Sequence, residues 1–255
     1  MFSIEHLHAL RSAEIEKIVS HFAPGSRILE LGAGTGRQAH ELQERGFDIV
    51  AVEMAESNYA QARCFPVIDY DGRRLPFEPR SFDIVFSSNV LEHVPDLALL
   101  NAEIRRVLRP DGYCVHVMPT HAWRFWTTLT AFPAALQYAA TLRSQLLPGW
   151  RSGRRDGNDL SEAWLRLARH LAAPLFQRRH GERGNAVSEL WLFHPGWWRT
   201  HFRKNGFEIV HDEPMGLFYT GHMLFGPRLS LVKRARLAPV VGSACHLFKI
   251  RPLPR

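Results

Sequence analysis

The chain has few cysteines, no long apolar run and no signal-like start, and each shortage narrows what the protein can be. Its three cysteines, Cys64, Cys114 and Cys245, are widely separated, and this spacing suits neither a disulfide framework nor a Cys-x-x-Cys metal site. The first residues lack a basic stretch followed by an apolar core, so we expect no signal peptide. No uninterrupted apolar run reaches the roughly 18 residues that a spanning helix needs. We therefore expect a protein of the reducing cytoplasm.

The 255 residues carry a net charge of +7, and this charge is unevenly spread. Residues 1–120 have 12 Lys+Arg and 17 Asp+Glu, whereas residues 121–205 have 13 and 5, and residues 206–255 have 7 and 3. The basic excess lies in the middle and at the end of the chain. It predicts either an anionic partner for these segments or a solvated basic surface. The length fits one α/β domain with an insertion.

A strand that runs into a glycine-rich turn is the most informative stretch. The apolar strand 28–31 meets three glycines at alternate positions, and residues 37–45 continue as a helix. The glycines are Gly32, Gly34 and Gly36. A dinucleotide site requires Gly-x-Gly-x-x-Gly, but Arg37 takes the place of the third glycine, so a diphosphate ligand is disfavoured. Glu30, just before the turn, would repel a phosphate and attract a cationic sulfonium or ammonium group.

This stretch resembles the first motif of the class I S-adenosylmethionine-dependent methyltransferases, written here Glu30-Leu31-Gly32-Ala33-Gly34-Thr35-Gly36. The resemblance implies an α/β fold with a Rossmann-like, mostly parallel seven-stranded sheet of order 3-2-1-4-5-7-6. It also implies S-adenosylmethionine as the cofactor. The residues of the motif expected to bind it are Glu30, Gly32, Ala33, Gly34 and Gly36.

An acidic residue follows the second predicted strand. Residues 47–52 form a near-continuous apolar run, typical of a strand buried in a parallel sheet, and this strand ends in Glu53. An acid at this position can accept hydrogen bonds from both hydroxyls of a ribose. In the methyltransferase family the corresponding acid binds the ribose, and the next residue, Met54, would pack on the adenine.

The stretch 69–96 resembles a pattern common among small-molecule methyltransferases of this class, D-x-x-x-L-P-F, then F-D-x-V, then L-E-H-V. Counting back from its leucine selects Asp71, with Gly72 beside it, rather than Asp69 as the acid that would hold the adenine amino group. The fourth strand, 82–86, leads to Asn89, where the methyl donor and acceptor should meet at the carboxyl end of the strand.

His93 follows directly and is the predicted catalytic residue. Its imidazole could accept the proton of a hydroxyl acceptor, or it could only shape the turn. A quinone-biosynthesis branch of the family has E-x-x-E-H here, but Asn89 replaces the first glutamate, so Glu92 and His93 are an incomplete set of ligands and we predict no metal. The N-P-P-Y and D-P-P-Y signatures of amino-methylating nucleic-acid enzymes are absent, which disfavours a DNA base as the acceptor, and we predict no nucleic-acid partner.

The long gap between the fifth strand, 113–118, and the sixth, 207–210, predicts an insertion with its own structure. We therefore divide the chain into a cofactor-binding core, an inserted helical cap that forms the acceptor region, and the end of the core with a basic tail. These parts are residues 1–120, 121–193 and 194–255. Within them we predict a loop at 148–159, a helix at 160–175 and the seventh strand at 224–232, and leave 233–255 unassigned.

The cap contains a second set of candidate residues. Around 178–185 lie arginines and His180, and Glu189 follows; His180 or Glu189 could act as the base while the arginines bind an anionic group, or the stretch could be an ordinary surface loop. The tryptophans and phenylalanines of 121–147, with the basic charge, also fit peripheral contact with a membrane. A satellite core of the insertion is the alternative for these aromatic residues.

From these observations we predict a methyltransferase acting on an oxygen or nitrogen of a small molecule or of a sugar- or lipid-linked intermediate with anionic character. An RNA methyltransferase that uses the basic insertion is one alternative. A scaffold that binds S-adenosylmethionine without catalysis is the other. The sequence does not identify the acceptor.

Overall fold

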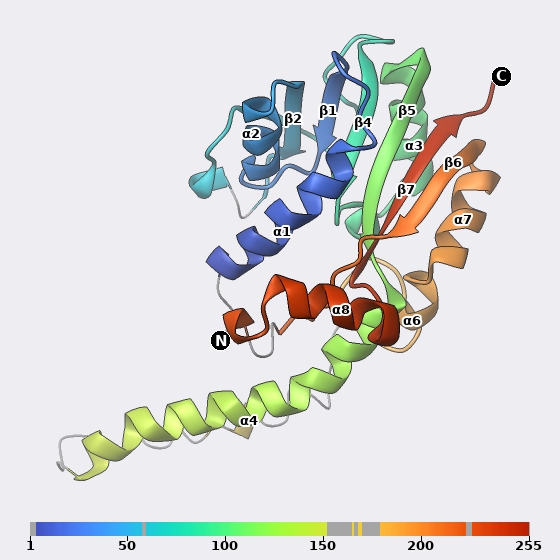
Figure 1. Cartoon of the computed structure of the whole chain (residues 1–255). Coiled ribbons are helices and arrows are strands. Elements are labelled where there is room, and N and C mark those ends of the chain that lie inside the picture. Colours follow the sequence, from blue (N-terminus) through green and yellow to red (C-terminus); the bar gives the residue numbers. More distant parts are fainter. Residues whose placement is uncertain are drawn as a thin grey trace.

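Figure 1 shows the computed structural model of the chain, which describes residues 4–57, 60–151, 165, 168–169, 179–222 and 226–254. A seven-stranded sheet forms its centre, and helices lie against the sheet. The long helix α4 (His121–Arg151) extends away from the sheet at one end. The molecule therefore has a core that carries the sheet and an arm built from the insertion.

The strand order is β3-β2-β1-β4-β5-β7-β6, as predicted. Strands β1 to β5 run parallel, and β7 is antiparallel to both β5 and β6. The bounds are β1 (Arg27–Leu31), β2 (Asp48–Met54), β3 (Val67–Tyr70), β4 (Phe82–Ser88), β5 (Leu108–Pro119), β6 (Phe207–Pro214) and β7 (Cys245–Pro252). The order reverses between β1 and β4, and ligands of such open sheets bind beyond the carboxyl ends of the strands at this reversal.

The sheet is buried on both faces. Successive residues of β1 point to opposite sides, so that Ile28 belongs to one core cluster and Leu29 to the other. Helices that lie along the sheet supply apolar side chains to each cluster, one pair to the first cluster and another pair to the second. They are α1 (Ile4–Val19) and α2 (Arg37–Glu44), then α3 (Leu97–Val107) and α7 (Pro195–Lys204). Burial on both faces explains the near-continuous apolar runs of the strands.

Element boundaries differ from the predicted ones by a few residues. Between β2 and β3 the chain forms the short 3₁₀ turn η1 (Ala60–Ala62). The Arg-Pro-Asp-Gly sequence at 109–112, which favours a turn, lies within β5, where the pairing with β4 shifts register between Phe82 and Ile84. A β-bulge inserts extra residues into one strand without ending it, and this explains why the turn signal did not end the strand.

The prediction of a seventh strand at 224–232 is wrong. Ser230 caps helix α8 (Leu231–Val241) instead, since its side chain accepts the backbone N–H of Lys233. Strand β7 lies at 245–252, within the segment that the sequence left unassigned. It pairs on both sides, with β5 and β6, and Phe248 at its centre is fully buried. Tertiary pairing outweighs the basic, proline-containing character of this segment.

The inserted region begins with α4. The first residues of the predicted loop, 148–151, are helical, and the rest of that loop lies outside the described residues. The predicted helix 160–175 is described only at residues 165, 168 and 169, which are helical. The short helix α6 (Glu189–Leu192) contacts α4, and the division into core, cap and tail stays a prediction. Among the helices of the described residues, none has the length and apolar character needed to cross a membrane.

Candidate functional site

The turn after β1 depends on glycine at each of its three glycine positions. All three have a positive φ: 67° at Gly32, 57° at Gly34 and 77° at Gly36. A Cβ at Gly32 would lie 2.5 Å from a methyl carbon of Val90, and one at Gly36 would lie 2.6 Å from the Cβ of Phe65. The turn therefore packs closely on the loops after β4 and before β3, and it exposes its backbone to a ligand.

Glu30 lies beneath this turn. Its side chain is buried, it accepts the backbone N–H of Ala39 in the first turn of α2, and its Oε2 has no hydrogen-bond partner. Gly36, the N-cap of α2, has no side chain, so Glu30 supplies the capping oxygen from another element. Burial raises the pKa of Glu30 to about 8. A cationic ligand group beside Glu30 would lower this pKa and favour the carboxylate, so the unpartnered Oε2 is compatible with the predicted role of Glu30, which stays a prediction.

Glu53 closes the turn from the tip of β2. Its Oε2 accepts the N–H of Gly34 at 2.7 Å, and its Oε1 accepts the N–H of Met54 at 2.8 Å. The N–H of Ala33 donates to the carbonyl of Val52 at 3.0 Å, which joins the turn to the same strand. Each carboxylate oxygen can accept a second hydrogen bond. The position of Glu53 therefore fits a pair of ribose hydroxyls.

The ends of β2 and β3 meet at Met54 and Gly72. The Met54 side chain lies 3.4 Å from the place where a Gly72 Cβ would stand, and Met54 is 46% exposed. The thioether is polarizable and can pack on a flat ring. The exposed Met54 side chain next to the Gly72 backbone could therefore pack against the flat face of an adenine.

Asp71 and Asp69 have different partners. Asp71 Oδ1 accepts the N–H groups of Arg73 and Arg74, at 2.8 Å and 2.9 Å, and Asp71 is exposed. The carboxylate of Asp69 is instead paired with the guanidinium of Arg63. Asp71 thus carries no ion-pair partner among the described residues, whereas Asp69 has one, and the choice of Asp71 for the adenine amino group stays a prediction.

Asn89 joins the end of β4 to helix α1. Its φ is 55°, and its N–H donates to the carbonyl of Val117 at 2.8 Å. With its amide oxygen turned toward α1, Asn89 accepts from the guanidinium of Arg11 at 2.6 Å. Arg11 also forms an ion pair of 2.8 Å with Glu14 on the same helix. Helix α1 therefore reaches the edge of the sheet where donor and acceptor should meet.

Two further residues complete this buried polar network. The hydroxyl of Tyr219 donates to Glu14 Oε1 at 2.8 Å, and it lies 3.0 Å from the sulfur of Cys245 at the start of β7. Arg11, Tyr219 and Cys245 were not predicted from the sequence as parts of the site. Their separation along the chain leaves no local pattern by which they could have been found.

His93 lies in the single turn η2 (Leu91–His93) after β4. Its side chain is 43% exposed, and its Nε2 lies 3.7 Å from Glu92 Oε1. The ring of His180 packs edge-on against it, with ring centroids 4.8 Å apart. Desolvation lowers the pKa of His93, so its imidazole is neutral near pH 7 and can accept a proton.

Glu92 is buried, and neither of its carboxyl oxygens has a hydrogen-bond partner. Burial raises its pKa to about 8. The ligand atoms of Glu92, His93 and His180 lie within 4.8 Å of one another, close enough to hold a metal ion together. The sequence prediction of no metal considered Glu92 and His93 without His180, and it stays a prediction.

His180 is held in place by Glu189. The fully buried carboxylate of Glu189 accepts the N–H groups of His180 and Gly181, at 2.5 Å and 2.7 Å, and pairs with Arg124 of α4 at 2.9 Å. Desolvation of the His180 ring, with His93 and Arg124 nearby, lowers its pKa to about 4. Glu189 therefore supports His180 from below, whereas the two imidazoles lie at the surface.

Arg183 fixes the turn that carries His93. Its guanidinium donates to the carbonyls of Val94 and Leu91, at 2.7 Å and 3.1 Å, and it lies over the ring of Trp197. The segment after the insertion thus folds back onto η2. The exposed imidazoles of His180 and His93, distant in sequence, are thereby brought together, and their role as bases stays a prediction.

The sheet order, the glycine turn and the acids at the tips of β2 and β3 define a Rossmann-like fold with a nucleoside-binding edge. Residues 29–116 match the family model described as a methyltransferase domain. The chain is 31% identical over 178 residues to the ubiquinone biosynthesis O-methyltransferase of Xanthomonas campestris pv. campestris (strain B100). The aligned region covers 64% of this chain and 70% of that protein. The chain belongs to the class I S-adenosylmethionine-dependent methyltransferases.

Other relatives agree with this assignment. An uncharacterized methyltransferase of Mycobacterium sp. (strain JLS) is 38% identical over 109 residues, 40% of this chain and 43% of that protein. The solved structure of an S-adenosylmethionine-dependent methyltransferase from Mesorhizobium loti shares the fold with a TM-score of 0.53 at 19% identity, over 94% of this chain and 97% of that one. The protein is thus an enzyme of this class, and its cofactor is S-adenosylmethionine.

Proposed function

We propose that the enzyme transfers the methyl group to a hydroxyl oxygen of an acceptor that carries an apolar, lipid-like part. The observation that carries this proposal is His93, a half-exposed, neutral imidazole just beyond the carboxyl end of β4. A hydroxyl must lose its proton as it attacks a methyl group, and His93 is placed to take that proton. The name of the Xanthomonas relative, an O-methyltransferase, supports oxygen over nitrogen.

The remaining residues have binding roles in this proposal. S-adenosylmethionine supplies a methyl group on a positively charged sulfur, which needs no further activation. Glu30 would face its cationic part and Glu53 its ribose, while Asp71 and Met54 would hold the adenine. The Asn89 backbone, fixed to β5 and to α1, would set the distance between the methyl group and the acceptor. Alignment and the exclusion of water are then the main contributions of the protein.

Exposed apolar side chains on α4 support an acceptor with a lipid-like part. They follow one helical face at spacings of four, three and four residues, and each is at least 46% exposed. They are Phe125, Leu129, Phe132 and Leu136. Helix α4, which carries these residues, extends away from the sheet (Figure 1). An apolar stripe on a projecting helix suits contact with a lipid surface.

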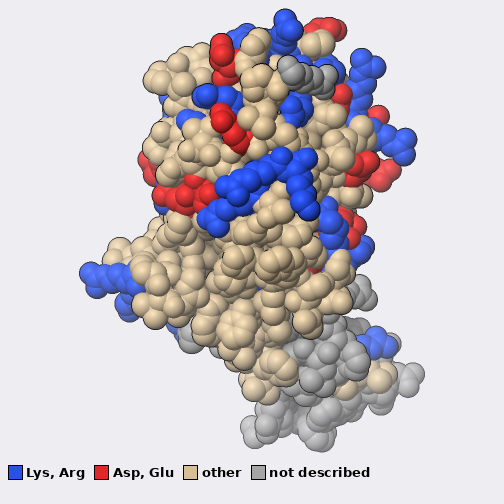
Figure 2. All heavy atoms as spheres, turned by 90° about the vertical axis from the view of Figure 1, so that its right-hand side faces the viewer, with Lys and Arg blue, Asp and Glu red and all other residues tan. Residues whose placement is uncertain are grey.

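The distribution of charge fits the same surface. On the face in Figure 2, charged side chains gather over the part that carries the sheet, and the part below it is mostly uncharged. Near it, α6 leaves Trp191 65% exposed. The segment 121–205, which contains α4 and α6, carries 13 Lys+Arg and 5 Asp+Glu, and this basic excess would be attracted to an anionic membrane surface. We therefore propose that the insertion rests on the membrane and that the acceptor comes from it.

The first experiment identifies the acceptor atom. The enzyme is incubated with S-adenosylmethionine labelled at its methyl group and with either the lipid or the aqueous fraction of a cell extract, and the product is analysed by mass spectrometry. We expect a methyl ether from the lipid fraction. His93→Ala should lower turnover about 10²- to 10⁴-fold without changing cofactor affinity measured by calorimetry. A labelled RNA or amine, or full turnover by the variant, would contradict the proposal.

The second experiment tests the membrane surface. Vesicles that contain an anionic phospholipid are sedimented with the protein, and the bound fraction is measured. Phe132→Asp or Leu136→Asp should weaken vesicle binding at least about tenfold, because each replaces an apolar side chain that would insert into the lipid by a charged one. Val210→Asp is the matched control, because Val210 and Phe132 are both 46% exposed but Val210 lies on β6. Equal loss in all three variants would show a general charge effect and would argue against α4 as the contact.

A further inference from the structure

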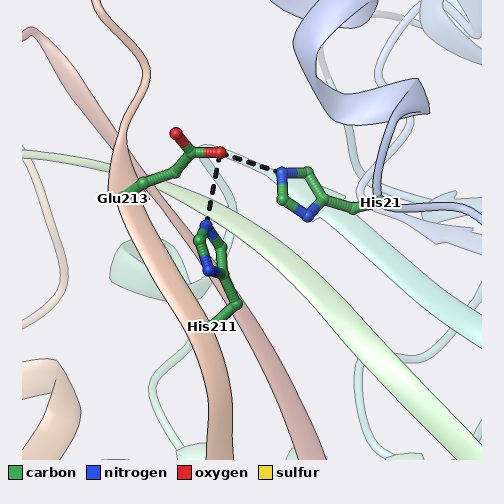
Figure 3. Close-up of side chains that lie close together, drawn as sticks. All are labelled: His21, His211 and Glu213. Carbon is green, nitrogen blue, oxygen red and sulfur yellow. Dashed lines mark hydrogen bonds and ion pairs between the residues drawn. The ribbon is translucent and has the colours of Figure 1, made fainter.

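A second group of metal-binding side chains lies at the end of α1 and on β6 (Figure 3). His211 and Glu213 are two residues apart on β6, so their side chains share a face of the strand. His21 follows α1 and turns its ring toward them. Glu213 Oε1 lies 3.0 Å from His21 Nε2 and 3.4 Å from His211 Nε2. One carboxylate oxygen and two imidazole nitrogens thus converge.

The two distances from Glu213 Oε1 to the imidazole nitrogens are close to those of a tetrahedral zinc site. Zn²⁺ binds imidazole nitrogen and carboxylate oxygen at about 2.0–2.2 Å, so two ligand atoms on one tetrahedral ion lie about 3.3 Å apart. All three ligand atoms of this cluster lie within 4.8 Å of one another. An ion could therefore enter between them with only small movements of the side chains.

The surrounding residues fix the ligands before any ion binds. Lys17 pairs with Glu213 Oε2 at 2.6 Å, which leaves Oε1 turned toward the histidines. The backbone carbonyl of His21 accepts hydrogen bonds from the hydroxyl of Tyr113 at 2.9 Å and from Lys249 at 3.2 Å. Such outer contacts orient metal ligands and strengthen binding. The positive charges of Lys17 and Lys249 oppose a cation, so the site needs an ion with strong nitrogen affinity.

We propose that His21, His211 and Glu213 form a zinc site with three protein ligands and a fourth position open to water. Zinc is preferred to magnesium or calcium because two of the three ligands are imidazoles. The site joins the end of α1 to β6, across 192 positions of sequence between His21 and Glu213. Arg11 of α1 donates a hydrogen bond to Asn89 at the end of β4. A bound ion would therefore also fix the position of α1 next to the place where the acceptor is proposed to bind.

The proposal is tested by zinc titration of the full chain against a chromophoric chelator. The exposed thiol is first removed by Cys64→Ser. His211→Ala should weaken zinc binding at least about tenfold, and zinc should raise the melting temperature of the parent but not of this variant. The His211 side chain is 49% exposed, so its loss should leave the fold intact, as circular dichroism can check. Glu213→Gln, which keeps the shape of the side chain, provides a second variant.

His180→Asn is the control for the other cluster, since it removes one of the three side chains around Glu92. We expect it to retain the binding that His211→Ala loses. The proposal is overturned if zinc binding is lost with His180→Asn and kept with both His211→Ala and Glu213→Gln. It is also overturned if the parent protein binds no zinc. None of these outcomes depends on the identity of the methyl acceptor.

Discussion

The cofactor edge of this enzyme comprises the glycine turn 32–36, Glu53 and Asp71, and the acceptor edge comprises Asn89, His93 and His180. The two edges are built in different ways. At the cofactor edge, the hydrogen bond from Gly34 to Glu53 spans 19 positions of sequence, and Asp71 binds the N–H groups two and three residues further on. At the acceptor edge, Arg183 reaches Val94 across 89 positions, and Arg11 reaches Tyr219 across 208. Short-range contacts make the first edge a property of local motifs. Long-range contacts make the second a property of the whole fold.

The largest test of this comparison is Arg124→Met. The change removes the buried partner of Glu189, the carboxylate that holds the backbone of His180. Breaking a buried ion pair by removing one partner costs about 3–5 kcal/mol. We expect the free energy of unfolding, measured with urea, to fall by about this amount. Turnover should fall with it, whereas cofactor affinity, measured by calorimetry, should stay within a few-fold.

The double variant Arg124→Met, Glu189→Gln is the control. It leaves a neutral pair of similar size, so it should recover part of the lost stability. If Arg124→Met lowers the free energy of unfolding by less than about 1 kcal/mol, the ion pair with Glu189 does not hold this edge together. If cofactor affinity falls as much as turnover, the two edges are not independent of each other.

The second test breaks the cofactor edge alone. Glu53→Ala removes the acceptor of the Gly34 N–H and the oxygens that would accept from the ribose. Hydrogen bonds to a charged group are worth about 1.5–3 kcal/mol, so we expect affinity for S-adenosylmethionine and S-adenosylhomocysteine to fall about 10- to 100-fold. Calorimetric titration measures this loss.

Asp69→Asn is the matched control, because the Asp69 carboxylate is already paired with Arg63 and should matter little to the cofactor. Unchanged affinity in Glu53→Ala would contradict the assignment of the ribose to this acid. A larger loss for Asp69→Asn than for Asp71→Asn would reverse the choice between these two acids.

The difference between the two edges also explains what the sequence could reveal. The glycine turn and the strands on either side of it were predictable because glycine spacing and apolar runs act over a few residues. The strand order followed from the resemblance to the methyltransferase family, which these local motifs carry. Strand β7 was misplaced because pairing with β5 and β6 decides it. His93 and His180 were each singled out as candidate bases, but no pattern showed that their rings would touch. Contacts across the fold have no local signature, and they make up most of the acceptor edge.

The third test concerns Glu92, the buried carboxyl group next to His93 at the acceptor edge. Its pKa of about 8 in the folded protein lies above its ordinary value of 4.5, so between these pH values the folded protein keeps a proton that the unfolded chain has released. The stability that depends on this proton is therefore lost as the pH rises from about 4.5 toward 8. Each such group contributes a slope of about 1.4 kcal/mol per pH unit.

Glu92→Gln removes this slope, since glutamine does not titrate. Urea unfolding of the cofactor-free protein at pH 5.5 and 7.5 should show a smaller loss of stability for the variant than for the parent, and the remaining loss should come partly from Glu30, whose pKa is also raised to about 8. The exposed Glu56→Gln is the control and should behave as the parent does. Equal slopes in Glu92→Gln and the parent would mean that Glu92 is ionised in the folded protein at neutral pH. A buried carboxylate in that state needs a cation beside it, and His93 and His180 would then be its nearest co-ligands.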